Sequence, residues 1–225
     1  MSELRLVIFD VDGTLVDSQV MIFEAFTHAY KQVGLPVPDR ATALSYVGMS
    51  LETIFPQLSP EADAATHAAL TQGYRDAYFH IRQTQGSNAT SPFFPGARGV
   101  LEQLRAQDWT LMAVATGKST RGLDKLLEGH GLGGYFVSLQ TADDHPSKPS
   151  PSMINAILSE TGVSRDRAVM VGDTTFDMDM ARAAGIKTIG VSWGYHPADQ
   201  LQADRMIRAF AALPQAIDDL IGLQG

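Results

Sequence analysis

The sequence predicts an α/β protein in which helices cover both faces of a parallel sheet and a further helical segment follows the first strand. Short apolar runs, each the length of a buried strand, end in loops that carry glycine or acidic residues. Helical patterns, with apolar residues three and four positions apart, lie between these runs. Such alternation with short connections is typical of a doubly wound, Rossmann-like sheet, which binds ligands at the carboxyl ends of its strands.

Five apolar runs are the predicted strands. Leu4–Phe9 is the first, and it breaks at the acidic loop Asp10-Val11-Asp12-Gly13. The others are Leu111–Ala115, the shorter Phe136–Leu139, Ala168–Val171 and Thr188–Ser192. A short apolar run that stops at such a loop indicates a strand buried within a parallel sheet.

Four helices are predicted beside these strands from their apolar positions and from their end signals. Their apolar stripes are Val100, Leu101 and Leu104; Leu123, Leu126 and Leu127; Met153, Ile154, Ile157 and Leu158; and Phe176, Met180 and Ala184. Ser119 precedes the second helix, and Ser150 with Pro151 is expected to cap and open the third. Gly162 and Gly185 are expected to end the last two helices.

The chain between the first two strands is too long for one crossover and reads as an inserted helical cap. Val20–Val33 has one apolar helical face, and Ser59-Pro60-Glu61 is expected to open a long helix. Its predicted inward positions are Ala62, Ala65, Ala69, Tyr74, Ala77, Tyr78 and Ile81. The stretch 86–96 is rich in Gly, Ser, Asn and Pro, which indicates a linker. We therefore expect a core of residues 1–16 plus 89–225 and a helical cap of residues 17–88, hinged over the sheet.

Composition narrows the possible functions. A chain of 225 residues with 44% hydrophobic residues can bury a real core, and its formal charge of −8 disfavours binding to nucleic acid. The absence of Cys excludes a thiolate nucleophile and a Cys-based zinc site. No apolar run approaches the roughly 20 residues that span a bilayer, and residues 1–5 do not resemble a signal peptide. We expect a cytoplasmic protein without membrane partners, and the sequence leaves monomer and homodimer open.

Acidic residues follow two of the predicted strands. Asp10 and Asp12 end the first strand, while Asp173 and Asp177 follow the run 168–171. Because neighbouring parallel strands end at the same sheet edge, Asp10, Asp12 and Asp173 are expected to converge there. Buried carboxylates are costly unless a cation or a proton neutralises them, and hard oxygen ligands favour Mg²⁺. Zinc would favour His or Cys, which these motifs lack.

Four motifs, in order along the chain, resemble those of the haloacid dehalogenase superfamily. They are Asp10-Val11-Asp12-Gly13-Thr14-Leu15-Val16-Asp17-Ser18, Thr116-Gly117-Lys118, Ser147-Lys148-Pro149 and Gly172-Asp173-Thr174 with Asp177. The helical insertion is similar to the cap of the superfamily's phosphoglycolate phosphatases, small-phosphoester hydrolases and sugar-phosphate mutases. The resemblance implies a Mg²⁺-dependent phosphatase with its site at the carboxyl edge of the sheet.

The chemistry of phosphate monoesters suggests a role for each acidic residue. Asp10 would attack phosphorus to form an aspartyl-phosphate, while its other oxygen binds Mg²⁺. Asp12 would protonate the leaving alcohol and then deprotonate the hydrolytic water. Asp173 would bind the metal directly, and Asp177 would lie behind the ligands or pair with Lys148. The resemblance implies that the metal ligand of Asp12 is its backbone carbonyl.

Other residues are expected to bind the phosphate and the rest of the substrate. Thr116 offers a hydroxyl, Gly117 a backbone N–H, and Lys148 the positive charge that holds nucleophile and phosphoryl group together. The superfamily commonly has Asn where this chain has Gly117. In the cap, Gly48 and Ser50 are candidates for substrate contact, although the segment 47–50 also reads as an ordinary helix connection.

The predicted function is hydrolysis of small phosphomonoesters, with phosphoglycolate as the single best substrate and pyrophosphate, nucleoside monophosphates and sugar phosphates as alternatives. Dehalogenases of the superfamily lack an acid at the position of Asp12, and its mutases place a His where this chain has Ile22. Two other classes remain open: a phospho-accepting receiver, whose chains are shorter and lack the insertion, and a binding protein without catalysis.

Overall fold

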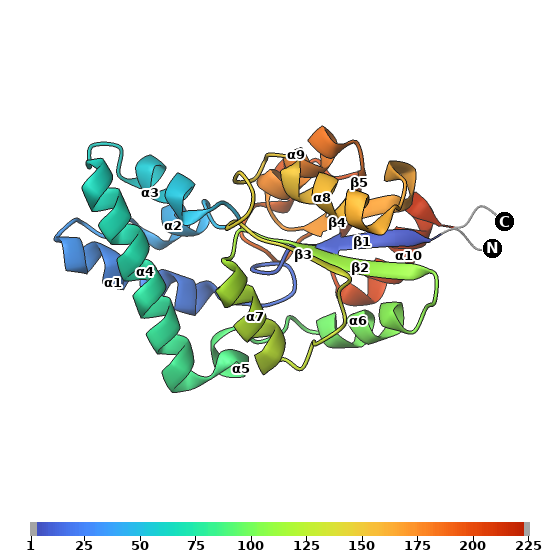
Figure 1. Ribbon diagram of the computed structural model, residues 1–225, viewed down its shortest axis with the longest axis horizontal. Helices are drawn as coiled ribbons and strands as arrows, with labels where there is room; N and C mark the ends of the chain where they lie inside the picture. The colour runs from blue at the N-terminus through green and yellow to red at the C-terminus, as the bar shows by residue number, and fades with distance from the viewer. Residues whose placement is uncertain (1–3, 223–225) are drawn as a thin grey trace.

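The computed structural model describes residues 4–222, and a six-stranded parallel sheet forms its centre (Figure 1). The strand order is β3-β2-β1-β4-β5-β6, with every neighbouring pair parallel. The strands are β1 (Arg5–Phe9), β2 (Thr110–Ala115), β3 (Ser138–Gln140), β4 (Ala168–Gly172), β5 (Lys187–Val191) and β6 (Arg205–Ile207). The predicted doubly wound α/β fold is therefore confirmed.

Alternate residues of the central strands point to opposite faces of the sheet, and both faces are covered. Val7 and Phe9 pack with α6 (Ala97–Arg105), α7 (Thr120–Gly129) and α10 (Leu213–Ile221). Leu6 and Ile8 pack on the other face with α8 (Ser152–Thr161) and α9 (Thr175–Ala184). All four of these β1 side chains are fully buried, which explains the unbroken apolar run.

Helices after β1 form a third apolar cluster, beside the sheet rather than on it (Figure 1). They are α1 (Gln19–Val33), α2 (Arg40–Leu44), α3 (Leu51–Leu58) and α4 (Ala64–Gln85). Phe26 of α1, Phe55 of α3 and Tyr74 of α4 meet edge to face, with ring centroids 5.0–6.3 Å apart. Contacts among these rings hold the three helices together. The predicted boundaries of the cap, at residues 17 and 88, fall before α1 and within the short helix α5 (Ser87–Thr90).

Three local predictions differ from the structure. The long helix begins at Ala64 instead of near Ser59, because the Asp63 side chain accepts a hydrogen bond from the Thr66 N–H at 2.8 Å and caps it. Ala65 and Ala69 are therefore exposed, and the buried stripe of α4 is carried by Leu70, Thr71, Gly73 and Ala77. Helix α8 begins at Ser152, so Ser150 is not its cap. Ser119, Gly162 and Gly185 end or cap their helices as predicted.

The strand order reverses between β1 and β4, and this is the place where doubly wound sheets bind ligands. The remaining elements are 3₁₀ turns at Arg165–Arg167, Ala198–Gln200 and Phe210–Ala212. Within residues 4–222, no helix has the length and apolar character needed to cross a membrane. The fold therefore presents the ends of β1, β2 and β4 to the helices α1–α4 (Figure 1).

Candidate active site

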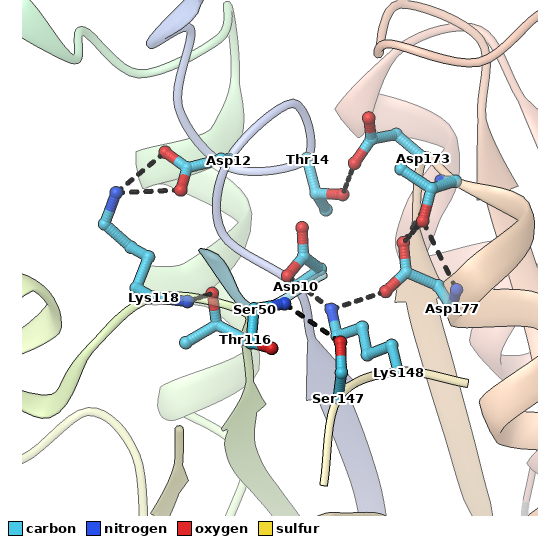
Figure 2. Close-up of polar contacts among 11 residues, drawn as sticks. Asp10, Asp12, Thr14, Ser50, Thr116, Lys118, Ser147, Lys148, Asp173 and Asp177 are labelled. Atoms are coloured by element: carbon cyan, nitrogen blue, oxygen red, sulfur yellow. Dashed lines mark hydrogen bonds and ion pairs between the residues drawn. The ribbon is translucent and has the colours of Figure 1, made fainter. Parts of the chain in front are cut away.

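The predicted acidic and polar residues converge at the carboxyl ends of the three central strands (Figure 2). Asp10 directly follows β1, Thr116 follows β2 and Asp173 follows β4. The Asp10 backbone N–H donates to the Val171 carbonyl at 3.0 Å, which continues the β1–β4 pairing into the site. The sheet itself thus brings Asp10 and Asp173 together, as the sequence predicted.

Lys148 lies at the centre of this site and contacts two carboxylates. Its ammonium is 2.7 Å from Asp10 Oδ1 and 2.7 Å from Asp177 Oδ1, and its side chain is 0% exposed. Burial by itself would lower the pKa of Lys148, but Asp10 and Asp177 outweigh it and raise the pKa. Lys148 is therefore a permanent cation, and it can compensate only one of its two carboxylates.

The second oxygen of Asp10 has no partner. Among residues 4–222, Asp10 Oδ2 is a buried side-chain oxygen without a hydrogen bond. Burial raises the pKa of Asp10 to about 7, against the opposing effect of Lys148 and with added repulsion from Asp177 and Asp12. A buried oxygen of this kind calls for a cation, because leaving it unpaired is costly.

Asp173 is held by groups from two distant loops. Thr14 Oγ1 donates to Asp173 Oδ1 at 2.7 Å, and the Tyr195 N–H donates to Oδ2 at 2.8 Å. Burial raises the pKa of Asp173 well above its ordinary value, with repulsion from Asp10 and Asp177 added. A Cβ at Gly13 (φ +84°) or at Gly194 would lie 2.3 Å or less from this carboxylate, so both loops need glycine to approach it.

Asp177 helps to cap the N-terminus of α9 and also contacts Lys148 in the site. The Thr174 Oγ1 hydroxyl and N–H both donate to Asp177 Oδ2, while Thr174 Oγ1 accepts from the Asp177 N–H, so the two residues form a capping box. Its other oxygen faces Lys148 (Figure 2). The predicted partnership between Asp177 and Lys148 is thus present in the structure.

Asp10, Asp173 and Asp177 each offer a carboxylate oxygen, and these oxygens lie within 4.8 Å of one another. A set of buried carboxylates with one unpaired oxygen fits a hard divalent cation such as Mg²⁺. The cluster differs from the predicted set Asp10, Asp12 and Asp173 in one member. It includes Asp177, for which we expected a place behind the ligands, and it omits the carboxylate of Asp12.

The Asp12 carboxylate instead lies on the side of the site away from Asp173 and contacts Lys118 (Figure 2). Lys118 Nζ is 2.9 and 2.8 Å from its two oxygens, and Ser18 Oγ donates to Oδ1 at 2.5 Å. Lys118 Nζ also donates to the Tyr78 hydroxyl of α4 at 2.7 Å. Asp12 is therefore oriented from both the core and the helical segment, and its backbone carbonyl remains the predicted metal ligand.

Sequence reasoning gave no catalytic or binding role to Lys118 or Tyr195. The position of Lys118 beside Thr116 and Gly117 was the available signal, since a strand end in this fold faces the ligand. Tyr195 also belongs to the site, because its hydroxyl lies 3.1 Å from Ser18 Oγ and its N–H donates to Asp173 Oδ2. Trp193 packs against Phe210, with their ring centroids 4.8 Å apart.

Glycine at position 117 is explained by a close approach of two backbones. A Cβ on Gly117 would lie 2.5 Å from the Gly48 carbonyl oxygen and 2.8 Å from that of Met49. The Ser50 N–H donates to Ser147 Oγ at 2.9 Å, next to Lys148. The segment 47–50 thus touches both the second and the third motif. Gly48 and Ser50 lie against the site, where the sequence predicted a possible substrate contact.

A cavity of about 560 Å³ opens from these residues toward the helical segment. Asp10, Asp12, Thr116, Gly117 and Lys118 line one part of it. Residues of α1, α3, α4 and α7 line the rest, together with the loop segments 47–49 and 142–143. Thr116 is buried, and its Oγ1 accepts only the Lys118 N–H at 3.3 Å within the described chain. The hydroxyl of Thr116 can therefore still donate to a ligand oxygen.

Comparison with known proteins agrees with this geometry. Residues 7–191 match the family described as haloacid dehalogenase-like hydrolase. The chain is 40% identical, over 95% of its length and 89% of the relative, to the "Probable phosphatase IndB" of Dickeya dadantii. It is 32% identical to the phosphoglycolate phosphatase of Chromobacterium violaceum, covering 95% of this chain and 96% of that one.

A solved structure has the same architecture. A haloacid dehalogenase-like family hydrolase from Streptococcus pneumoniae superposes with a TM-score of 0.81 at 26% identity, covering 95% of this chain and 98% of that chain. The motif order, the sheet topology and the converging carboxylates are all consistent with these matches. The chain belongs to the haloacid dehalogenase-like hydrolase family and is an enzyme of that class.

Proposed function

We propose that this protein is a Mg²⁺-dependent phosphatase that hydrolyses small-molecule phosphomonoesters through an aspartyl-phosphate on Asp10. The observation that carries the proposal is the buried Asp10 carboxylate, with one oxygen on Lys148 and the other without a partner. A carboxylate nucleophile needs this arrangement: one side held in place by a cation, and the other side free to meet the substrate or the metal.

Asp10, Asp173 and Asp177 would supply the carboxylate ligands of Mg²⁺, together with the backbone carbonyl of Asp12 that the family resemblance implies. When bound, Mg²⁺ would neutralise the negative charge that gathers between the acidic residues and the phosphoryl oxygens. Lys148, the Thr116 hydroxyl and the Gly117 N–H would contact the remaining phosphoryl oxygens. These contacts orient phosphorus toward the Asp10 carboxylate.

The reaction needs two proton transfers, and Asp12 is the residue proposed to make both. An oxygen of Asp10 attacks phosphorus while the ester oxygen departs as an alcohol, taking a proton from Asp12. Water then attacks phosphorus of the aspartyl-phosphate and gives its proton to Asp12. Inorganic phosphate leaves and the Asp10 carboxylate is regenerated. Lys118 and Ser18 hold the Asp12 carboxylate in position for these transfers.

Several curated relatives are named phosphoglycolate phosphatase, which makes phosphoglycolate the first compound to assay. Pyrophosphate, nucleoside monophosphates and sugar phosphates complete the panel. The receiver alternative is separated by the number of turnovers, since a receiver would release at most one phosphate per chain.

The test is phosphate release from this panel with Mg²⁺, before and after chelation, by the natural chain and by Asp10→Asn. We expect many turnovers that chelation abolishes, and no release by the folded variant, checked by circular dichroism. Undiminished release by Asp10→Asn would remove Asp10 as the nucleophile. Release that persists after full chelation would overturn the metal requirement.

A further inference from the structure

The cavity over Asp10 is larger than a glycolate group requires. At roughly 30 Å³ per water molecule, a cavity of about 560 Å³ has room for about 19 waters. A phosphoryl group on the Asp10 side and a two-carbon acid beyond it would leave most of this space to solvent. The size is instead that of pockets which bury a whole mid-sized ligand.

The walls beyond the phosphate site are largely apolar and rich in aromatic rings. Phe26 of α1 and Tyr74, Tyr78 and Phe79 of α4 line the cavity, together with Met49 and Leu51. Tyr74 and Tyr78 are stacked, with centroids 5.8 Å apart and planes at 26°. Walls of this kind bind flat apolar groups by burial and by ring stacking.

The same walls also carry charged side chains. Outside the acidic site, three arginines and three acidic residues line the cavity: Arg75, Arg82, Arg121, Glu52, Asp76 and Asp143. Arg75 is paired with Glu52 at 2.7 Å. Arg82 donates to the Gly122 carbonyl, and Arg121 lies over the Phe79 ring with 4.4 Å to its centroid. Arg75 is therefore held by an acidic side chain, whereas Arg82 and Arg121 contact neutral groups.

One polar group on the aromatic wall has no partner. Within residues 4–222 the Tyr74 hydroxyl makes no hydrogen bond, although burial raises the pKa of Tyr74 well above its ordinary value and keeps it protonated. It lines the cavity beside Tyr78, whose own hydroxyl is occupied by Lys118. The Tyr74 hydroxyl can therefore donate to, or accept from, a polar substituent on a bound ring.

We infer that the leaving group of the natural substrate is an alcohol that carries an aromatic or similarly flat apolar group, larger than glycolate, seated between α1, α3 and α4. The inference rests on the proposed phosphatase function and specifies its substrate class. Apolar burial in this cavity would supply binding energy remote from phosphorus, which an enzyme can use to orient the ester over Asp10.

Two esters test the inference without changing the chemistry of the leaving group. Ethyl phosphate and 2-phenylethyl phosphate both release primary alcohols, so their difference reports mainly the phenyl group. We expect kcat/KM for 2-phenylethyl phosphate to exceed that for ethyl phosphate and for phosphoglycolate by at least about tenfold. Equal values, or a preference for phosphoglycolate, would overturn the inference while leaving the phosphatase function intact.

Variants of one wall residue provide a second test. Phe79→Ala removes a cavity ring, and we expect it to lower the preference for 2-phenylethyl over ethyl phosphate by about fivefold or more, whereas Phe79→Leu keeps an apolar side chain and most of the preference. Phe136→Ala removes a ring that packs near Phe9, outside this cavity, and should leave the preference unchanged. An unchanged preference in Phe79→Ala would overturn the placement of the aromatic group.

Binding to Asp10→Asn gives a readout without turnover. With Mg²⁺ present, calorimetry should show 2-phenylethyl phosphate binding about tenfold or more tightly than ethyl phosphate. If the natural chain hydrolyses none of the esters, the proposed function fails, and the inference fails with it. If it hydrolyses them all alike and binding shows no preference, only the inference fails.

Discussion

Lys118 Nζ lies 2.9 and 2.8 Å from the two carboxylate oxygens of Asp12, so one ammonium contacts both oxygens of the proposed acid–base residue. The same ammonium donates to the Tyr78 hydroxyl, on a helix that follows β1 and precedes β2. Asp12 is thus tied to the second motif and to α4 at once. Its orientation depends on the helical segment as well as on the sheet.

We expect Lys118→Ala to lower kcat by at least about tenfold, because Asp12 would keep only Ser18 as a direct side-chain partner. The loss should be larger for alkyl phosphates than for p-nitrophenyl phosphate, whose leaving group needs no proton. A lysine that acts only through phosphate binding would instead raise KM for both esters alike. Lys118→Arg keeps the charge and should restore part of the loss. An unchanged kcat on alkyl esters would contradict the positioning role.

Lys148 should matter to folding as well as to catalysis. Lys148→Met leaves Asp10 and Asp177 buried without their cation, and removing one partner of a buried ion pair typically costs about 3–5 kcal/mol of unfolding free energy. We expect a lowered Tm that added Mg²⁺ partly restores, since the metal would neutralise the same carboxylates. Lys125→Ala removes an exposed pair with Glu128 and should cost less than about 1 kcal/mol. Equal Tm values for the two variants would contradict this account.

The sequence predicted the sheet, the helices on its faces and the meeting of Asp10 with Asp173, because each rests on a local pattern. An apolar run defines a strand, and parallel neighbours end at one edge. The strand β6 was not predicted, since it has only three residues and two of them are exposed. Its apolar content is too small to stand out from a loop.

The parts of the site that were missed depend on pairs far apart in the chain. Lys118 and Asp12 are separated by 106 positions, and Tyr195 and Asp173 meet through a backbone N–H that every residue type except proline supplies. No spacing encodes such contacts. Position 117 is a similar case. It requires glycine because the Gly48 carbonyl of a distant loop lies against it, and this contact exists only in the folded chain.

We expect Gly117→Ala to displace the segment 48–49, because the new Cβ would lie within 2.8 Å of two backbone carbonyl oxygens. Overpacking of this kind typically costs about 1–3 kcal/mol, and kcat/KM should fall as the segment moves away from Ser147 and Lys148. Gly99→Ala is the matched control. It lies inside α6, and beyond its chain neighbours and the helix's own backbone no atom lies within 4 Å of the new Cβ, so the substitution should stabilise the protein by about 0.5–1 kcal/mol. A fully active and equally stable Gly117→Ala would show that the two backbones do not need this approach.

The stability of the protein should fall in mild acid in part because of His130. This side chain is buried, its Nε2 lies 2.9 Å from the Ser91 carbonyl oxygen, and its ring packs 4.3 Å from that of Phe93. Burial lowers the pKa of His130 below its ordinary 6.5, against the effect of the Ser91 carbonyl and with help from Arg98.

The sign of the pH dependence follows from this shift. Below about pH 6.5 the unfolded chain binds a proton that the folded chain resists, so the free energy of unfolding decreases as the pH falls toward the folded-state pKa. Above pH 6.5 the imidazole is neutral in both states and its contribution is constant. Urea unfolding of the natural chain and of His130→Gln between pH 5 and 8 isolates this group from the carboxylates. The natural chain should lose more stability than the variant between pH 7 and 5, and parallel curves would assign the acid sensitivity to other groups.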